Sequence, residues 1–171
     1  MCVLVEPSVR YKASYLAAVH ELQGEGKRLD ENIRFLSENF DAFIMRTLQQ
    51  KDRAHVPLGR VPNTDFWLID SGEFVGRLNL RYELDADLLK FGGHIGYEVR
   101  PSRRKQGYGT RMLHLGLEKA KAAGIYRVLV TCDENNIGSK KIIEHNGGKF
   151  ENAVHVDGSA VKKLRYWIDV A

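Results

Sequence analysis

Gly-Tyr-Glu-Val-Arg-Pro at residues 96–101 leads into Arg-Lys-Gln-Gly-Tyr-Gly at residues 104–109, and an amphipathic stretch follows at residues 110–123. The pattern predicts a strand that ends at a proline, a turn that contains glycine, and a helix. The first N–H groups of a helix have no intrahelical acceptor and lie at its positive end, a geometry that binds phosphate. The sequence therefore predicts a binder of a phosphorylated cofactor.

Two common phosphate loops do not fit this register. A dinucleotide fingerprint would need a third glycine at Met112, and a Walker-type loop would need Gly-Lys-Ser/Thr. What remains is Arg/Gln-x-x-Gly-x-Gly at the head of a helix, after a strand that ends in Val-x-Pro. This pattern resembles the pyrophosphate loop of the GNAT superfamily, the GCN-related N-acetyltransferases that use acetyl-CoA.

The resemblance extends from Gly92 to Phe150. Residues 126–131 form an apolar, β-branched run typical of a buried strand, and turn-forming residues follow at 132–136. Asn136 and Ser139 match the family's Asn-x-x-Ser/Ala helix, which flanks the pantetheine arm of the cofactor. The chain is most similar to an uncharacterised bacterial branch with Gly-Gly-His-Ile-Gly-Tyr-x-Val-Arg-Pro-Ser, here residues 92–102, and Arg-Tyr-Trp-Ile, here residues 165–168.

The organisation of the chain indicates one mixed α/β (α+β) domain over residues 1–171, without repeat or linker. Helical spacing is found in residues 15–22 and 40–48, while residues 27–37 are ambiguous. Alternation predicts an antiparallel meander over residues 65–100 and a final hairpin with strands at 150–156 and 160–170. The resemblance implies a central, mostly antiparallel mixed sheet of six or seven strands, flanked by about four helices.

The composition limits the classes of function. A net charge of +4 and two basic pairs outside the loop do not indicate nucleic acid as a partner. Cys2 and Cys132 are isolated, and the histidines lack metal-ligand spacing, so free thiols and no metal site are expected. The sequence has no apolar run near the roughly 20 residues that span a bilayer and no signal-peptide pattern, so we expect a cytoplasmic protein that does not enter the membrane.

The expected cofactor is acetyl-CoA, which acts as co-substrate. The backbone N–H groups of residues 106–110 would bind its diphosphate, and two basic residues beside them would add charge. By family analogy, the main chain of Val99 would face the thioester carbonyl and the pantetheine amide. The predicted cofactor-binding residues are Val99, Arg100, Arg104, Lys105, Gln106, Gly107, Tyr108, Gly109, Thr110, Asn136 and Ser139.

The predicted catalytic residues are Glu98, His94 and Ser139. Glu98, next to Val99, is the candidate base, with a surface ion pair to Arg100 or Arg81 as the alternative. His94 is a candidate proton shuttle, or else a structural residue bonded to the Gly92–Gly93 backbone.

The proton donor is less clear from the sequence. Many family members carry a tyrosine donor seven residues after the helix asparagine, and this position is Ile143 here. The donor would then be Ser139, water or no group at all.

The resemblance also implies direct transfer to a primary amine of a small molecule or peptide in a ternary complex. Glu25, Asp30 and Glu31 could attract a cationic amine and Tyr166 or Trp167 could stack on it, although an exposed acidic loop and core aromatic residues explain them as well. The alternative function is a non-catalytic acyl-CoA sensor. The amine, the length of the acyl group and the oligomeric state, with a homodimer among the alternatives, remain open.

Overall fold

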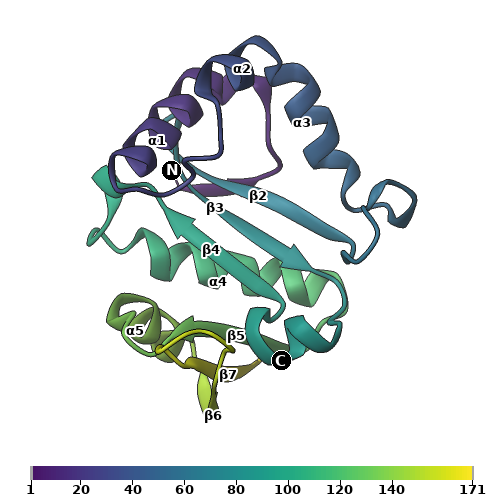
Figure 1. The fold of residues 1–171 in the computed structure, drawn as a ribbon, viewed down its shortest axis with the longest axis vertical. Coiled ribbons are helices and arrows are strands. Elements are labelled where there is room, and N and C mark those ends of the chain that lie inside the picture. The colour runs from purple at the N-terminus through teal and green to yellow at the C-terminus, as the bar shows by residue number, and fades with distance from the viewer. Residues whose placement is uncertain (1, 171) are drawn as a thin grey trace.

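A seven-stranded mixed sheet with helices on both faces is formed by residues 2–170, the part of the chain that the computed structural model describes (Figure 1). The strand order is β1-β2-β3-β4-β5-β7-β6, and only β4 and β5 are parallel. The expected sheet and the meander at residues 65–100 are thereby confirmed. The strands are β1 (Val3–Val5), β2 (Asn63–Asp70), β3 (Glu73–Arg81), β4 (Ile95–Val99), β5 (Arg127–Asp133), β6 (Lys149–Val154) and β7 (Lys163–Asp169).

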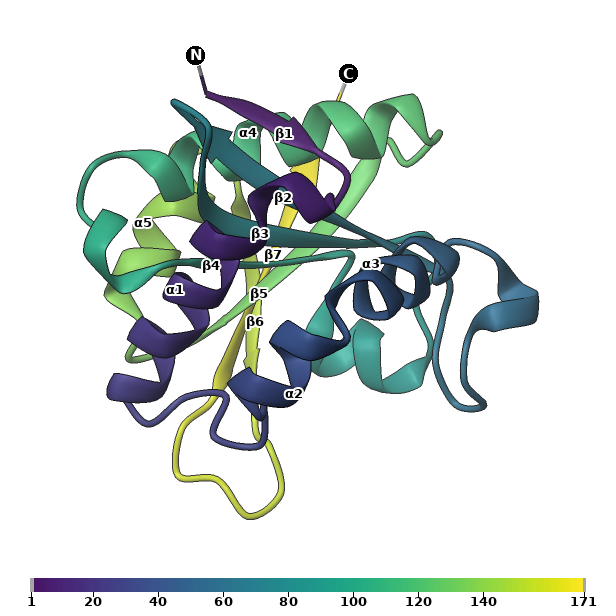
Figure 2. The same cartoon turned by 90° about the horizontal axis from the view of Figure 1, so that it is seen from above.

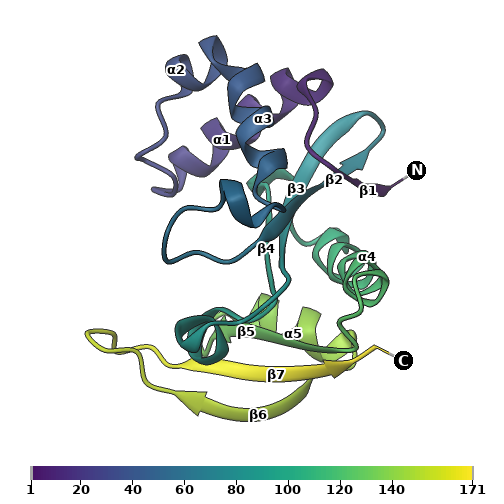
Figure 3. The ribbon, with the colours of Figure 1, turned by 90° about the vertical axis from the view of Figure 1, so that its right-hand side faces the viewer.

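Helices cover the two faces of the sheet unequally. Figure 3 shows α1, α2 and α3 on one face of β2–β4 and α4 on the other, and α5 packs against α4 and β5. The α-helices are α1 (Lys12–Gly24), α2 (Ile33–Glu38), α3 (Phe40–Gln49), α4 (Tyr108–Ala122) and α5 (Ile137–His145). The ambiguous segment 27–37 contains the start of α2, where Asn32 caps the helix by accepting the Phe35 N–H at 2.9 Å.

Alternation along the central strands divides the core into two clusters. The larger cluster lies between the sheet and α4, with Leu78 and Val130 completely buried. The smaller one is aromatic and lies under α1 and α3, where the ring of Tyr15 stacks on Trp67 at 4.6 Å between centroids. The face toward α4 is therefore largely apolar, with the buried Thr64 as a polar exception, while the other face is apolar where α1 and α3 cover it.

The last hairpin differs from the sequence expectation. Its strands end at Val154 and begin again at Lys163, so residues 155–162 form a loop rather than a tight turn at Asp157-Gly158. Figures 2 and 3 show this loop projecting on the same side of the sheet as α1–α3. Within residues 2–170, no helix is long and apolar enough to cross a membrane.

Candidate functional site

The parallel pair β4 and β5 separates along its length. The two strands pair at Ile95 and Val130, and the register does not continue beyond this point. Arg100 donates its N–H to the carbonyl of Val75 on β3 at 2.9 Å. Because bonding direction alternates along a strand, the N–H and C=O of Val99 point the other way, toward the gap in pairing with β5. The N–H of Val99 is thus available to a ligand.

A cleft of about 670 Å³ opens at this separation. It is bounded by the connection after α1, by β4 and the turn behind it, and by the first turns of α4 and α5. The structure brings nine of the predicted residues to this cleft: Glu98, Val99, Arg104, Lys105, Gly107, Gly109, Thr110, Asn136 and Ser139. His94, Arg100, Gln106 and Tyr108 do not line it.

The turn before α4 presents a row of free amide groups. Gly107 has a left-handed backbone (φ 82°), and the first helical hydrogen bond runs from the N–H of Arg111 to the Gly107 carbonyl at 3.1 Å. Within residues 2–170, the six N–H groups from Lys105 to Thr110 have no hydrogen-bond acceptor. Six consecutive donors at a helix N-terminus fit the diphosphate of a coenzyme A derivative.

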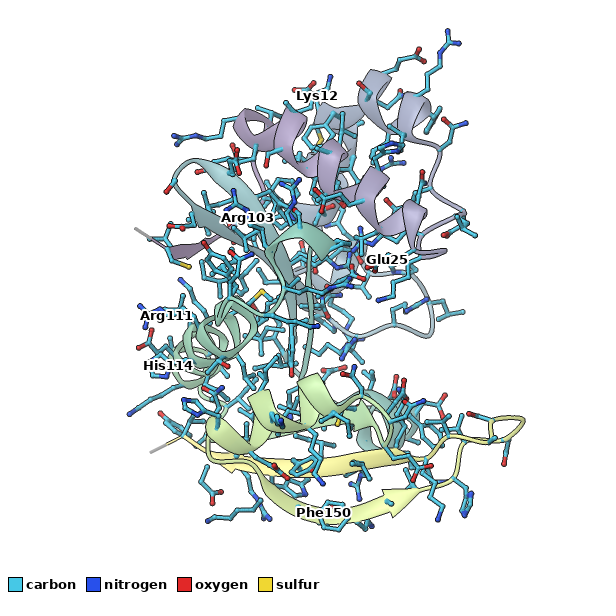
Figure 4. The ribbon with its side chains drawn as sticks, turned by 90° about the vertical axis from the view of Figure 1, so that its left-hand side faces the viewer. Lys12, Glu25, Arg103, Arg111, His114 and Phe150 are labelled. Atoms are coloured by element: carbon cyan, nitrogen blue, oxygen red, sulfur yellow. The ribbon has the colours of Figure 1, made fainter. Side chains whose placement is uncertain are left out.

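Arg104 fastens this turn to its surroundings. Its Nε donates to the Val99 carbonyl at 3.1 Å, and its Nη1 lies 2.8 Å from each carboxylate oxygen of Glu25. Figure 4 shows Glu25 close to this turn, which also carries Arg103. Arg104 therefore orients the Val99 carbonyl, and Glu25, a predicted amine-binding residue, is engaged in neutralising Arg104.

The side chain of Arg100 points away from the cleft. It forms an ion pair with Glu21 of α1 and donates to the Phe74 carbonyl at 3.1 Å. Burial opposes the ionisation of Glu21, but hydrogen bonds from Arg100 and Ser102 lower its pKa to about 2. Arg100 thus joins α1 to the end of β4, and only its backbone is close to the predicted cofactor site.

Gln106 and Tyr108 also direct their side chains elsewhere. Nε2 of Gln106 donates to the Ser102 carbonyl at 3.1 Å, and the Tyr108 hydroxyl donates to Asp70 Oδ2 at 2.8 Å. Both residues therefore contribute only their main-chain N–H groups to the row of free donors.

A hydroxyl pair lies at the α5 side of the cleft. The hydroxyls of Tyr97 and Ser139 are 2.7 Å apart and hydrogen-bonded. Burial raises the pKa of Tyr97 to about 12, and the hydrogen bond to Ser139 offsets this only partly. Asn136 Oδ1 caps α5 by accepting the Ser139 N–H at 3.0 Å, which leaves the Asn136 amide N–H groups free to donate. Ile143 is completely buried in the core.

Glu98 lies on the opposite face of β4. Its Oε2 accepts from Arg28 at 2.8 Å, so the pairing with Arg100 or Arg81 that the sequence offered as an alternative is wrong. Arg28 follows α1 in a left-handed conformation (φ 51°) and also binds Glu31 and the Tyr15 hydroxyl, each at 3.3 Å. Within residues 2–170, Oε1 of Glu98 has no hydrogen-bond partner.

His94 sits where β4 and β5 still touch. The ring Nδ1 accepts the backbone N–H of Leu129 at 2.9 Å, and the backbone N–H of His94 donates to the Leu129 carbonyl at 2.8 Å. The expected bond to the Gly92–Gly93 backbone is wrong, because both carbonyls accept from Arg81 instead. Burial, and then the charge of Arg81, lowers the pKa of His94. The imidazole therefore holds the strand junction in its neutral form.

The two aromatic residues of β7, Tyr166 and Trp167, contact other side chains of the protein. Tyr166 is 1% exposed and belongs to the larger core cluster, as the structural explanation expected. Trp167 lies edge-on to His94 and donates Nε1–H to Glu151 at 3.0 Å. Asp30 is exposed, whereas Glu31 is bound to Arg28.

The sequence interpretation missed Arg28 and gave Tyr97 no role. Alternation along β4 does place Tyr97 opposite Glu98, and its proximity to Ser139 could have been inferred from the matched asparagine helix. Arg28 carried no local signal, because it lies in a loop whose path depends on how α1 packs.

Comparison with known proteins agrees with this geometry. The family model described as "Acetyltransferase (GNAT) family" matches residues 19–147. The fold is similar to RimJ of Mycobacterium smegmatis in complex with CoA-disulfide (TM-score 0.71, 22% identity, 98% of this chain and 81% of that chain). It is also similar to RimL, the ribosomal L7/L12 α-N-protein acetyltransferase, in complex with coenzyme A (TM-score 0.70, 14% identity, 99% and 94%).

A third similar fold is the microcin C7 self-immunity acetyltransferase MccE in complex with acetyl-CoA and AMP (TM-score 0.70, 12% identity, 99% and 92%). The search of curated proteins finds no significant match. The family model covers most of the chain, and the solved structures share its fold over nearly the whole length. The chain belongs to the GNAT family of acetyltransferases.

Proposed function

We propose that this chain transfers an acetyl group from acetyl-CoA to a primary amine in a ternary complex. The observation that carries the proposal is the row of six N–H groups from Lys105 to Thr110, which have no acceptor within residues 2–170. The row lies at the cleft beside the N–H of Val99, which is not bonded to β3. Similar folds bound to coenzyme A derivatives, RimJ and RimL among them, support the choice of cofactor.

Acetyl-CoA would lie with its diphosphate on residues 105–110 and its pantetheine arm between β4 and α5. Lys105 would add positive charge at the diphosphate, whereas Arg104 is paired with Glu25 and holds the Val99 carbonyl. The amide of Asn136 would face the arm. The co-substrate supplies an acetyl group activated as a thioester. The N–H of Val99 would donate to the thioester carbonyl oxygen, an interaction that strengthens as negative charge develops there.

Glu98 is our candidate for the proton acceptor on the amine side. The transfer forms a C–N bond and breaks the thioester C–S bond, and the net proton passes from the amine to the departing thiolate. Arg28 binds Oε2 of Glu98, and within residues 2–170 Oε1 remains free to accept a hydrogen bond from an ammonium group or from a bridging water. His94 has only Nε2 left for proton transfer, so we assign it chiefly to holding the strand junction.

The hydroxyl pair of Tyr97 and Ser139 is our candidate for proton donation to the thiolate. Tyr97 stays protonated at neutral pH because its pKa is about 12, and Ser139 can pass a proton between Tyr97 and the cleft. The donor would thus come from β4 and α5 together. Ile143, at the position of the usual tyrosine, is a buried core residue.

The second candidate function is a non-catalytic acyl-CoA sensor, which the apolar Ile143 favours. Binding and turnover separate the two functions. Isothermal titration should show coenzyme A binding much more tightly than pantetheine, which lacks the diphosphate, and equal affinities would refute the phosphate site. Thiol release from acetyl-CoA in the presence of a panel of primary amines then identifies the enzyme, whereas binding without thiol release from any amine identifies the sensor.

A further inference from the structure

A second cleft, of about 620 Å³, lies on the sheet face that carries α1–α3. Arg77 lines this cleft and pairs across the strands with Glu98, which lines the cofactor cleft. The two clefts are therefore neighbours on the sheet, with Glu98 at their junction. The volume suits a small molecule or the end of a longer chain.

The strip of β4 between Arg81 and Glu98, which we take as the floor between the two clefts, includes a position without a side chain. Gly96 lies two residues before Glu98 on the same face of β4, about 7 Å away along the strand. A methyl group placed at Gly96 would lie 3.5 Å from Nη2 of Arg81. The guanidinium of Arg81 thus lies over Gly96, two residues along β4 from Glu98.

Positive charge gathers at the Arg81 end of this floor. Nη1 of Arg81 donates to the Gly92 and Gly93 carbonyls at 3.2 and 2.9 Å, whereas Nη2 has no acceptor within residues 2–170. Arg60 and Arg77 line the same cleft. Burial, and then the charge of Arg77, lowers the pKa of Arg81, and Asp65 and Asp85 offset this only partly.

The carboxylates of this cleft are either engaged or at its rim. Asp65 accepts from Asn79 Nδ2 at 2.8 Å and lies 3.9 Å from Arg77. Asp85 accepts the N–H of Leu88 at 2.8 Å, and Asp87 is exposed. None of them neutralises Nη2 of Arg81, so an anion that entered this cleft would find a charged donor there.

The other end of the floor is negative. Glu98 offers its free Oε1, and Glu31 lies on the far side of Arg28. Because Gly96, under the Arg81 guanidinium, and Glu98 are only about 7 Å apart along the strand, a ligand that contacts both charged groups needs only a few atoms between its own charges. We infer that the acceptor is a small zwitterion, a free amino acid, whose ammonium group binds beside Glu98 and whose carboxylate binds Arg81.

This inference rests on the proposed function, and a substrate panel separates the two. Initial rates of thiol release are measured with the twenty L-amino acids, their carboxamides and the matching decarboxylated amines. We expect kcat/KM for the best amino acid to exceed that of its carboxamide by about 10- to 100-fold, the effect of a charge-assisted hydrogen bond. Equal or better turnover of the carboxamides would overturn the inference and leave the acetyltransferase assignment standing.

If no amine is consumed, titration of the amino acids into the protein loaded with coenzyme A decides the question, because absence of binding overturns the inference. Failure of coenzyme A itself to bind overturns both proposals.

An Arg81→Gln variant tests the residue that binds the carboxylate. Its kcat/KM for the amino acid should fall about 10-fold or more, while kcat/KM for the carboxamide should change less than about twofold. A purely structural role of Arg81 would lower both values together and would overturn the assignment. The matched control is Arg34→Gln, which removes an exposed guanidinium on α2, outside both clefts, and should leave the preference unchanged.

Discussion

The substitution Gly107→Glu tests the diphosphate site most directly. Gly107 has φ 82°, and no atom lies within 4 Å of the Cβ that a side chain would add. The variant therefore pays a backbone cost of about 1–2 kcal/mol in folding stability without any steric clash. Its carboxylate, however, would stand beside the bound diphosphate.

The magnitude follows from the charge and the distance. Two like charges about 4 Å apart repel by about 1 kcal/mol in water and by about 4 kcal/mol at an effective dielectric constant of 20. Since 1.4 kcal/mol corresponds to a factor of ten, the Kd of acetyl-CoA should rise between about 5-fold and about 700-fold. The penalty should shrink in 1 M salt, where the screening length falls to about 3 Å.

Gly124→Glu is the matched control for this experiment. Gly124 has φ 80° with nothing within 4 Å of its added Cβ, but it follows the C-terminal end of α4, at the opposite end of the helix from the turn. Both variants should lose similar stability in thermal unfolding, and only Gly107→Glu should weaken binding in isothermal titration. An unchanged Kd for Gly107→Glu, or equal weakening by both variants, would refute the diphosphate site.

Three further predictions concern stability and proton transfer. Glu21→Gln should lower the free energy of unfolding by about 2–3 kcal/mol at pH 7, because it removes the ion-pair partner of Arg100. The pKa of Glu21 falls from 4.5 to about 2 on folding, so the difference between variant and wild type should be complete above about pH 5 and disappear as the pH drops toward 2. Urea titrations at several pH values check this. Gly116→Ala should destabilise the fold by about 1–3 kcal/mol, because the new methyl group would overlap a completely buried leucine of β3, whereas Gly138→Ala meets only one atom at 3.7 Å and should be neutral in the same melts. Tyr97→Phe should lower kcat about tenfold or more with an unchanged Kd for acetyl-CoA, and an unaltered kcat would remove the hydroxyl pair from the mechanism.

The parts of this site that the sequence predicts are those built from neighbouring residues. The turn before α4 needs a proline-ended strand, a left-handed glycine and an amphipathic helix, and all three can be read within residues 96–123. The separation of β4 from β5 depends on contacts between distant parts of the chain and cannot be read from a local pattern. The expectation that the main chain of Val99 faces the thioester came instead from the family resemblance. Periodicity also predicted that Leu78 and Leu80 share a face, but the expectation that Phe74 shares it is wrong, because a register shift between β2 and β3 turns Phe74 into the aromatic cluster under α1.

Partners far apart in the chain could not be predicted in this way. Glu98 and Arg28 are 70 positions apart, and Arg100 and Glu21 are 79 positions apart. Both pairs form because the end of α1 packs over the end of β4, and no local pattern states that arrangement. The loop that holds Arg28 gave no helical or strand period at all, so its side chain could be assigned only once the aromatic cluster under α1 had fixed the position of that helix.

The strand β4 explains how acid and base chemistry can coexist in so small a site. Acyl transfer requires a proton acceptor on the amine side and, where a donor is used, a proton donor on the thiol side. Consecutive residues of a strand point to opposite faces, so Glu98 lies on the face that carries Arg28 and Arg77, while Tyr97 faces α5 and Ser139. Val99 follows with its main chain turned to the gap between the strands. One strand, paired with β3 along its length, therefore fixes the proposed acceptor, the proposed donor and the carbonyl-binding N–H relative to one another, and a tyrosine on α5 is not needed to complete the arrangement.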